Sequence, residues 1–238
     1  MAQYLVLIPA FNEEKRISTV IQGVKKSFPQ ADVLVVDDGS SDETRGRAIE
    51  AGAKVISHPF NLGYGIALQT GYIYALQEGY ETLIQMDGDG QHDPFSIAEL
   101  LGGIQSGEAD IVIGSRFLRT RHFTPEFGGY PTPFARKLGM RLFSMITSAI
   151  TRQKITDSTS GYQAMNRRVL EWVSSDKFPW DYPDADVIIM LHRAGFRIME
   201  VPVRMVPSET KKSMHSGWKP LYYVFKMFLS ILVALMRK

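Results

Sequence analysis

The stretch "QMDGDGQHDP", Gln85 to Pro94, places Asp87, Asp89 and Asp93 close to one histidine, directly after the apolar run "ETLI". Carboxylates one residue apart can face the same side once the chain leaves a strand. Mg²⁺ in proteins is held by one or two carboxylates, by water and by substrate phosphates, and glycines between the acids would let a phosphate approach the backbone. The stretch therefore predicts a metal–diphosphate site. The alternative is a solvated acidic turn in which Asp93 caps the next helix and His92 is structural.

Two further acids, Asp37 and Asp38, follow a second apolar run that contains Val33 to Val36. A carboxylate there can accept hydrogen bonds from a base N–H or a ribose hydroxyl. The alternative is that this stretch only caps the following helix, through Ser41 or Asp42.

Weaker signals come from three other strand or turn ends. Glu13 and Glu14 fall in the first turn of a helix, where the helix dipole alone would explain them. The turn "NLGYG" can admit a phosphate to the backbone, and Arg116, after a fifth apolar run, can pair with a diphosphate or lie on the surface.

The composition allows a large α/β domain and excludes several protein classes. The chain has 238 residues, is 45% hydrophobic and carries a formal net charge of +2, so nucleic acid is not an expected partner. It has no cysteine, which excludes disulfides and thiolate zinc sites. The N-terminal apolar run stops at Pro9 without a basic segment before it, so we expect a first strand rather than a signal peptide. We expect the chain in the cytoplasm or on a membrane surface facing it.

Apolar runs that alternate with helical spacing predict a mostly parallel sheet with helices on both faces. Ile17, Val20, Ile21 and Val24 recur at helical spacing after Asn12, a potential cap. The expected strands lie within residues 4–10, 33–36, 53–58, 81–86, 109–117 and 196–206, and residues 157–172 are expected to form a turn, a strand and a short helix. The other expected helices follow Ser41, "NLGYG" and Pro94, and cover 134–151, 185–194 and 221–236. Residues 118–133, rich in proline and aromatics, predict a binding loop.

Six motifs occur in an order that resembles family 2 glycosyltransferases of the GT-A fold. They are "LIPAFNEE", "VVDDGSSDET", "NLGYGIALQTG", "DGDGQHDP", "IGSRF" and "DSTSGYQAMNR", and the resemblance covers roughly residues 3 to 205. The chain is most similar to the branch of dolichyl-phosphate mannosyltransferases and bacterial polyprenyl-phosphate glycosyltransferases. The resemblance implies a nucleotide-diphospho-sugar donor, an inverting reaction and a Mg²⁺ or Mn²⁺ cofactor.

The resemblance also assigns residues by position. It places the donor at Pro9, Ala10, Phe11, Glu13, Asp38, Gly65, Asp87, Gly88, Asp89 and Arg116. It assigns Asp89 and Gln91 to the metal, and Asp89 and Arg116 to catalysis. In the mannosyltransferases a tyrosine usually stands where this chain has Phe11. Those enzymes also carry a basic R-x-x-G-x-S-K segment after the last strand. Here that segment reads "RMVPSETKKSMHSGWKP". The candidates for holding the acceptor phosphate are Arg136, Arg204, Lys211 and Lys212.

The acceptor decides which catalytic groups are needed. A polyprenyl phosphate is already anionic, because the second pKa of a phosphate monoester is about 6, so it needs cations rather than a base. The alternative is a saccharide hydroxyl, which needs a base, and Asp157 in "TDSTSGY" is the candidate; Asp157 can also be an orienting or capping residue. A third hypothesis is a silent nucleotide-sugar-binding protein, which the cluster of acids disfavours.

The tail predicts how the chain would reach a lipid. As a helix, Leu221 to Met236 would be about 24 Å long, short of the about 30 Å of a bilayer core, and it has basic flanks. We therefore expect a domain over residues 1–210 and a membrane-interfacial helix within 211–238. The segment 134–151 has similar spacing and would share that surface. The alternatives are a helix packed on the domain, or a contact with a second copy or a small integral membrane partner.

Overall fold

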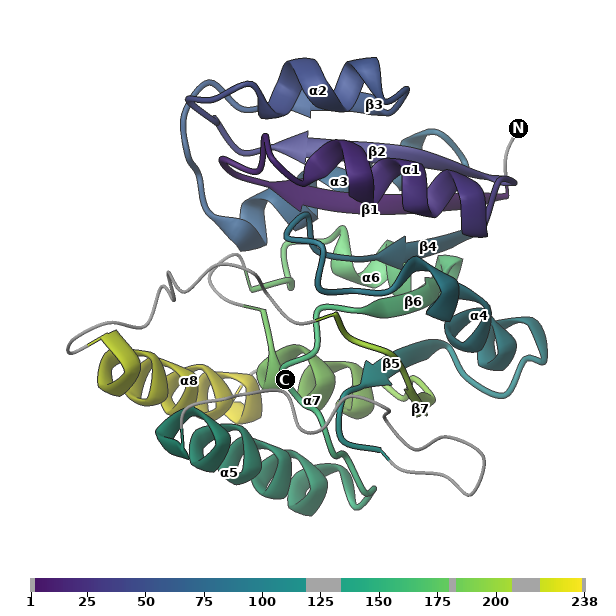
Figure 1. Cartoon of the computed structure of the whole chain (residues 1–238). Coiled ribbons are helices and arrows are strands. Elements are labelled where there is room, and N and C mark those ends of the chain that lie inside the picture. The colour runs from purple at the N-terminus through teal and green to yellow at the C-terminus, as the bar shows by residue number, and fades with distance from the viewer. Residues whose placement is uncertain (1–2, 119–133, 180–182, 207–218, 237–238) are drawn as a thin grey trace.

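A computed structural model describes residues 3–118, 134–179, 183–206 and 219–236 of the chain (Figure 1). Its centre is a seven-stranded sheet in the order β3-β2-β1-β4-β6-β5-β7. The strands are β1 Tyr4–Ala10, β2 Ala31–Asp37, β3 Lys54–Ser57, β4 Thr82–Gln85, β5 Ile111–Ser115, β6 Gln163–Asn166 and β7 Ile198–Pro202. Only β6 runs antiparallel to its neighbours among these strands. The prediction of an α/β fold with a mostly parallel sheet is confirmed.

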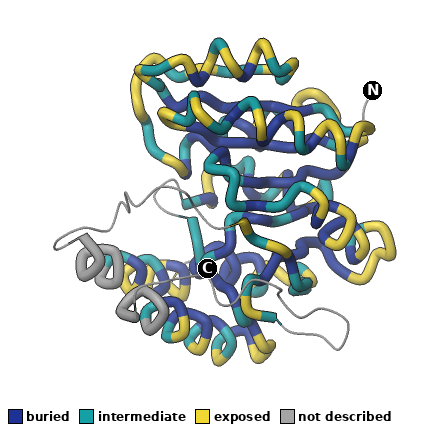
Figure 2. Tube along the Cα trace, in the orientation of Figure 1, coloured by how far each residue is buried: buried dark blue, intermediate teal, exposed yellow. Residues whose placement is uncertain are grey.

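Helices cover both faces of the sheet because successive residues of the central strands, which point to opposite faces, are largely apolar. Val6 and Ile8 of β1 belong to a core with α1 Ile17–Ser27, α2 Thr44–Glu50 and α4 Ile97–Gln105. Leu5 and Leu7 belong to the opposite core, with α3 Tyr64–Gln77, α6 Arg167–Val173 and α7 Ala185–Arg193. Figure 2 shows the strands buried between these layers. Burial on both faces explains why the strands read as continuous apolar runs.

Two long helices form a further layer outside α7. They are α5 Phe134–Thr151 and α8 Lys219–Met236, which lie side by side in Figure 1. Their shared core with α7 contains Phe143, Ala185, Ile189, Met227 and Ile231. The structure therefore places the tail helix against the protein along one face.

Polar contacts add to this packing of α8 on α7. Arg193 donates from Nη1 to the carbonyl oxygens of Ala234 at 2.6 Å and Leu235 at 2.7 Å, and the Ser230 hydroxyl donates to the buried Asp186. Arginine at a helix C-terminus satisfies carbonyls that have no partner inside the helix. Within the described residues, no helix combines the length and the apolar character that crossing a membrane requires.

The local predictions fail mainly at helix starts. Asn12 does not cap α1: its φ is +57° and its side chain accepts from the backbone of Ser41 at 2.9 Å. Ser41 is not a cap either, whereas Asp42 accepts from Thr44 N at 3.0 Å. Asp93 accepts from Phe95 N at 3.0 Å and starts a short 3₁₀ turn, Pro94–Ser96, ahead of α4, as the capping alternative predicted. The expected loop at 118–133, apart from Leu118, and the domain boundary at 210 lie outside the described residues.

Candidate active site

The carboxyl ends of β1, β2 and β4 lie at one edge of the sheet, since these strands are parallel neighbours. In open α/β sheets ligands bind outside this edge. A side-chain carbon at Gly88 would lie 3.3 Å from the carbonyl oxygen of Pro9 and 3.5 Å from Cβ of Ala10. One at Gly161 would lie 2.9 Å from Oη of Tyr64 and 3.2 Å from Oδ1 of Asp87. Four segments therefore meet around Asp87, and a side chain at Gly88 or Gly161 would crowd its neighbours there.

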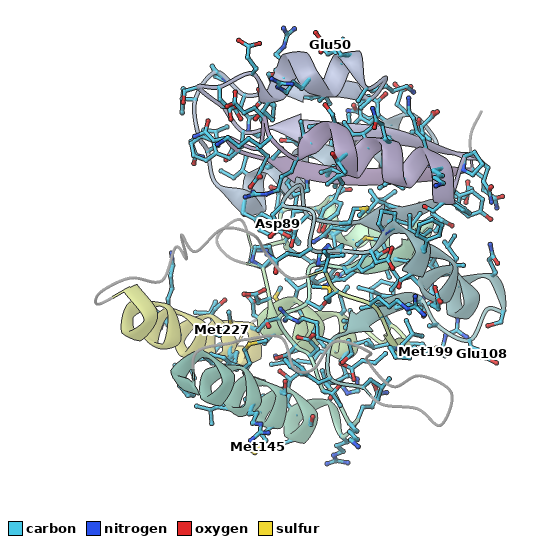
Figure 3. All side chains as sticks on the ribbon, viewed as in Figure 1. Glu50, Asp89, Glu108, Met145, Met199 and Met227 are labelled. Atoms are coloured by element: carbon cyan, nitrogen blue, oxygen red, sulfur yellow. The ribbon has the colours of Figure 1, made fainter. Side chains whose placement is uncertain are left out.

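The acidic pair lies in this meeting point, with Asp89 at the centre of the molecule in Figure 3. Burial raises the pKa of Asp87, whereas a hydrogen bond from the Tyr64 hydroxyl, 3.0 Å away, and the charge of Arg116 lower it. Burial also raises the pKa of Asp89, and the charge of Asp87 adds to that rise. Burial disfavours the ionised forms of both carboxylates, and their charges repel each other. A cation bound by these carboxylates and by a substrate phosphate would stabilise the ionised forms.

The residues present fit a divalent metal of the Mg²⁺ type. Asp89 accepts from the backbone N–H of Gln91 at 2.9 Å and from the Gln91 side-chain amide, so the two side chains already adjoin. The described part of the chain contains no group of three or more His, Cys, Asp or Glu placed to hold an ion. Oxygen ligands from one carboxylate and one amide leave most of the coordination shell to water and substrate phosphates, as Mg²⁺ prefers.

His92 packs under the turn that carries Asp87 and Asp89 and is hydrogen-bonded to its backbone. It is buried, its ring stacks on Tyr162 with centroids 4.7 Å apart, and its Nδ1 accepts from the backbone N–H of Asp87 at 2.9 Å. Burial lowers the pKa of His92 to about 4, so the ring is neutral at neutral pH. The structural role that the sequence suggested for this histidine agrees with these contacts.

Asp38 at the end of β2 is buried and holds the turn that precedes α3. Its Oδ1 accepts from His58 Nδ1 at 2.7 Å and from Leu62 N at 2.9 Å, and its Oδ2 accepts from Gly63 N at 2.8 Å. Nε2 of His58 lies 3.0 Å from the hydroxyl of Thr70 on α3. Asp38 thus shapes the edge where the sequence placed the nucleoside, and His58 was missed because only the fold brings it there.

The remaining donor residues from the resemblance lie around the same edge. Phe11, just after β1, is 46% exposed, and Gly65 is buried in the first turn of α3. Glu13 pairs with Arg16 at 2.6 Å. Burial raises the pKa of Glu13, the charge and hydrogen bond of Arg16 oppose that rise, and the charge of Asp89 adds to it.

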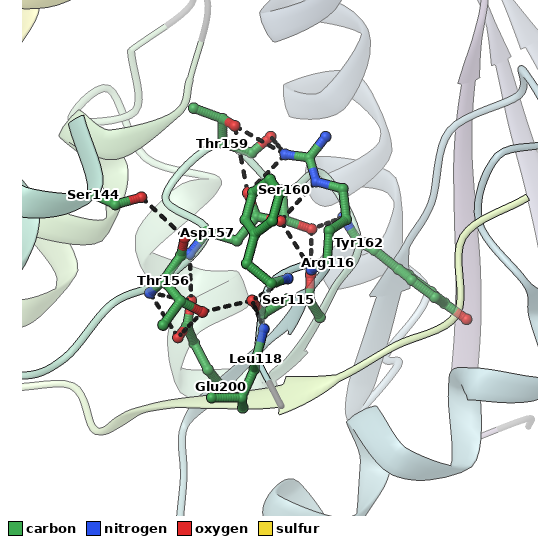
Figure 4. A network of polar contacts seen from close by, with 12 residues as sticks. Ser115, Arg116, Leu118, Ser144, Thr156, Asp157, Thr159, Ser160, Tyr162 and Glu200 are labelled. Atoms are coloured by element: carbon green, nitrogen blue, oxygen red, sulfur yellow. Dashed lines mark hydrogen bonds and ion pairs between the residues drawn. The ribbon is translucent and has the colours of Figure 1, made fainter. Parts of the chain in front are cut away.

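Arg116, which follows β5, is held by Asp157 in a two-point ion pair (Figure 4). Nε donates to Oδ2 and Nη2 to Oδ1, both at 2.6 Å, and the backbone N–H of Arg116 also donates to Oδ2 at 3.0 Å. Nη2 further donates to the hydroxyl of Thr159 at 2.9 Å. Asp157 is 1% exposed, and both its oxygens face Arg116. A carboxylate so engaged orients the guanidinium and is badly placed to take a proton from an acceptor.

The segment after β7 crosses the acidic turn. Val206 N donates to the carbonyl of Gln91 at 2.8 Å, and Asp93 N donates to the carbonyl of Arg204 at 3.4 Å, around an antiparallel bridge between His92 and Met205. The exposed Arg204 therefore lies next to the turn that carries Asp89. Of the other predicted acceptor residues, Arg136 lies on α5 with its side chain outside the described part, and Lys211 and Lys212 are outside the described residues.

Several glycosyltransferase sequences are similar to this chain over most of its length. It is 30% identical over 232 residues to a polyprenol monophosphomannose synthase of Mycolicibacterium smegmatis, covering 94% of this chain and 84% of the relative. It is 31% identical over 221 residues to an undecaprenyl-phosphate mannosyltransferase of Micrococcus luteus, covering 90% and 87%. It is 30% identical over 258 residues to a UDP-N-acetylglucosamine–dolichyl-phosphate N-acetylglucosaminyltransferase of Methanococcus voltae, covering 100% and 99%.

Solved structures share the fold. The glucosyl-3-phosphoglycerate synthase of Mycobacterium tuberculosis, in a complex with Mn²⁺, uridine diphosphate and glucosyl-3-phosphoglycerate, matches with a TM-score of 0.68. The identity is 21%, and the match covers 99% of this chain and 79% of that one. Residues 5–173 match the family model described as glycosyl transferase family 2. The chain therefore belongs to glycosyl transferase family 2, with the fold that its motifs predicted.

Proposed function

We propose that this protein transfers a sugar from a nucleotide-diphospho-sugar to a polyprenyl phosphate, with inversion at the sugar carbon. The observation that carries the choice of acceptor is the engagement of Asp157. Both of its oxygens accept from Arg116, and the side chain is buried. The candidate base for a hydroxyl acceptor is thus committed to an arginine, whereas a phosphate acceptor needs no base at neutral pH. The named activities of the three relatives support the same acceptor class.

The roles of the site residues follow from their positions. Phe11 and Gly65 would line the nucleoside pocket, which Asp38 would shape through the turn before α3, and Asp87 would bind the ribose and diphosphate side. Asp89 and Gln91 would hold Mg²⁺ or Mn²⁺, which would act as a Lewis acid toward the leaving diphosphate. Arg116, oriented by Asp157, would stabilise the negative charge that builds on the diphosphate as the sugar leaves. The mycobacterial synthase, which shares the fold, was solved with Mn²⁺ and uridine diphosphate, which is consistent with a divalent metal and a nucleotide donor.

The lipid end of the acceptor would be met by the layer formed by α5 and α8. The outward side chains of α8 include Leu229, Leu232, Val233 and Met236, which are exposed, and Met145 lies on the outer side of α5 (Figure 3). An apolar stripe on a helix too short to span a bilayer is typical of binding in the interface. We propose that this layer lies on a membrane surface, on the cytoplasmic face, and that Arg204 with Arg136, Lys211 and Lys212 binds the lipid phosphate. A small integral membrane partner or a second copy of the chain stays a prediction.

The test is a transfer assay with two classes of acceptor. Mannosyl and N-acetylglucosaminyl nucleotide donors would be offered with undecaprenyl or dolichyl phosphate in detergent, and separately with free saccharides. We expect transfer to a lipid phosphate, loss of transfer with a chelator, and recovery on adding Mg²⁺ or Mn²⁺. Transfer to saccharides alone would overturn the proposed acceptor. Donor binding without transfer to either class would favour a silent binding protein.

A further inference from the structure

Glu200 in the middle of β7 has its partners in the turn that carries Asp157 (Figure 4). Its Oε1 accepts from the backbone N–H groups of Thr156 at 3.0 Å and Asp157 at 2.8 Å. Its Oε2 accepts from Thr156 N at 2.8 Å and from the Thr156 hydroxyl at 2.9 Å. One partly buried carboxylate thus binds two consecutive peptide groups that are more than 40 residues earlier in the chain.

The same turn is tied to two other elements. The Ser115 hydroxyl at the end of β5 lies 2.6 Å from the Thr156 hydroxyl, and the backbone N–H groups of Phe117 and Leu118 donate to Ser115 Oγ at 3.2 and 3.1 Å. Ser144 of α5 donates to the carbonyl oxygen of Thr156 at 3.1 Å. Since Thr156 gives its own proton to Glu200, these bonds form one chain that begins at the residues flanking Arg116 and ends at Glu200.

We infer that Glu200 is a positioning residue for the sugar-transfer reaction: its carboxylate fixes the backbone of Thr156 and Asp157, and through Asp157 it sets the position of the Arg116 guanidinium at the donor diphosphate. Glu200 touches neither the acidic pair nor Arg116 in any described contact. The inference rests on the proposed function for the identity of the substrate. The contacts of Glu200 do not depend on that function.

The chemistry of the contacts explains why a carboxylate stands there. The two peptide N–H groups that face Glu200 can only donate, and the Thr156 hydroxyl donates to it as well, so a carboxylate, which has two acceptor oxygens and no donor, suits all three. Burial raises the pKa of Glu200, and the hydrogen bonds from Thr156 and Asp157 oppose that rise by stabilising the ionised form. A glutamine in its place would keep the shape but turn an NH₂ group toward peptide N–H donors. The turn would then shift, and the two-point bond between Asp157 and Arg116 would lose its alignment.

The experiment compares Glu200→Gln with a matched change on the same sheet. Asp110→Asn also replaces a carboxylate by an amide in a cluster of donors that includes Arg197, next to the start of β7. The cluster around Asp110 does not contact the turn at 156–157 in the described contacts. Transfer rate, donor KM and thermal unfolding would be measured for both variants, with amide hydrogen exchange at Thr156 and Asp157.

We expect Glu200→Gln to lower kcat by about 10- to 100-fold with little change in donor KM, because a misplaced charge stabiliser affects the transition state most. The amide exchange rates at Thr156 and Asp157 should rise in Glu200→Gln. Thr156→Val should lower kcat and raise these exchange rates as well, but by less. Asp110→Asn should lower the melting temperature but keep kcat and the exchange rates at 156–157.

The inference would be overturned if Glu200→Gln and Asp110→Asn lowered the melting temperature equally and also lowered kcat equally. A wild-type kcat in Glu200→Gln would overturn it as well. A wild-type protein without transfer activity would overturn the proposed function instead. In that case the exchange comparison still decides whether Glu200 fixes the turn, and unchanged exchange in Glu200→Gln would reject that role by itself.

Discussion

Asp87 and Asp89 are separated by one residue, yet their side chains have different hydrogen-bond partners and different charged neighbours. Asp87 accepts from Tyr64, which in turn accepts from Gln85 Nε2 at 3.2 Å, and it feels the charge of Arg116. Asp89 has its contacts with Gln91 and lies near Glu13. The first carboxylate is oriented by the Tyr64 hydroxyl next to the arginine. The second accepts from the backbone and side-chain N–H groups of Gln91, one of the two predicted metal ligands, and interacts with the charge of Glu13. This difference supports donor binding for Asp87 and metal binding for Asp89.

Replacing Asp89 by Ala should abolish metal-dependent transfer, because it removes a direct anionic ligand. Asp87→Ala should weaken donor binding. The control is Asp93→Asn in the same turn, since asparagine serves as well as aspartate at a helix start and should leave transfer intact. Metal titration of transfer and of donor-induced thermal stabilisation measures both effects. Wild-type turnover in Asp89→Ala would reject the metal assignment.

Asp38→Asn should raise the donor KM about tenfold, equivalent to about 1.4 kcal/mol, and change kcat less. The amide cannot accept from His58, Leu62 and Gly63 together, so the turn that borders the nucleoside side would loosen in ground and transition states alike. Steady-state kinetics with varied donor separates the two constants. An unchanged KM would remove Asp38 from the donor site.

At the scale of elements, one carboxylate joins the ends of three strands. The buried Asp110, just before β5, accepts from Arg197 at 2.9 Å through the backbone and at 3.1 Å through the side chain, from Asn166 at 2.9 Å and from Arg168 at 3.2 Å. The hydrogen bonds from Arg197 hold the pKa of Asp110 well below its ordinary value. The carboxylate thus fixes β6 and β7 on either side of β5.

The stability from Asp110 should depend on pH in a defined window. Since its folded pKa is lower than its unfolded pKa of about 3.9, the contribution is complete above about pH 4 to 5 and is lost as the pH falls below that value. Asp110→Asn should cost about 1 to 3 kcal/mol at neutral pH and flatten the acid limb of the stability curve. Urea unfolding of both proteins from pH 7 to pH 3 measures this. Parallel curves would show that Asp110 is not the group responsible.

The sequence predicts elements best where burial is continuous. β1 covers the predicted residues 4–10 because a strand buried on both faces gives a continuous apolar run, and α5 covers the predicted 134–151 because an amphipathic helix gives apolar residues at helical spacing. The start of α1 was predicted wrongly because Asn12 bonds to Ser41, on another segment. A local sequence pattern cannot show that a candidate capping side chain is hydrogen-bonded instead to a residue far away in the sequence.

The same limit explains which site residues were missed. Asp87, Asp89 and Arg116 follow apolar runs, and the topology of a parallel sheet brings strand ends together. His58, Tyr64 and Glu200 act through partners at least 20 residues away. Glu200 had one readable signal: it is an acid inside the apolar run "IMEVPV". A charge in a buried strand requires a partner, but spacing cannot say which one.

At the scale of the molecule, the two halves of the sheet carry different tasks. Most of the proposed donor residues lie at or after the ends of β1, β2 and β4, with Gly65 on α3 and Arg116 after β5, whereas α5, α7 and α8 adjoin the half with β6, β5 and β7 (Figure 1). Arg116, which follows β5 in the second half, is close enough to Asp87 in the first half for its charge to lower the pKa of that carboxyl. A sugar held by the first half would therefore face an acceptor that arrives over the second.

The position of α8 changes how membrane binding should be tested. Met227, Ile231 and Ala234 are buried against the protein, whereas Leu229 and Leu232 are 50% and 54% exposed. Deleting the helix would uncover the core that it shares with α7, so loss of activity would not distinguish packing from membrane binding. Leu229→Ser combined with Leu232→Ser changes only the outward face and should keep the fold.

That double variant should bind liposomes more weakly and transfer sugar more slowly to a long-chain lipid phosphate, because apolar area buried in the interface drives binding at about 25 cal/mol per Å². Transfer to a short, water-soluble polyprenyl phosphate and the donor KM should stay near wild-type values, since most of the proposed donor residues lie on the other half of the sheet. The matched control is Ile49→Ser on α2, where the side chain is 49% exposed, and it should change none of these quantities. Liposome flotation and the ratio of the two transfer rates measure the effect. If the double variant keeps full liposome binding and an unchanged ratio, the outward face of α8 does not meet the membrane, and a second protein copy becomes the better candidate for covering it.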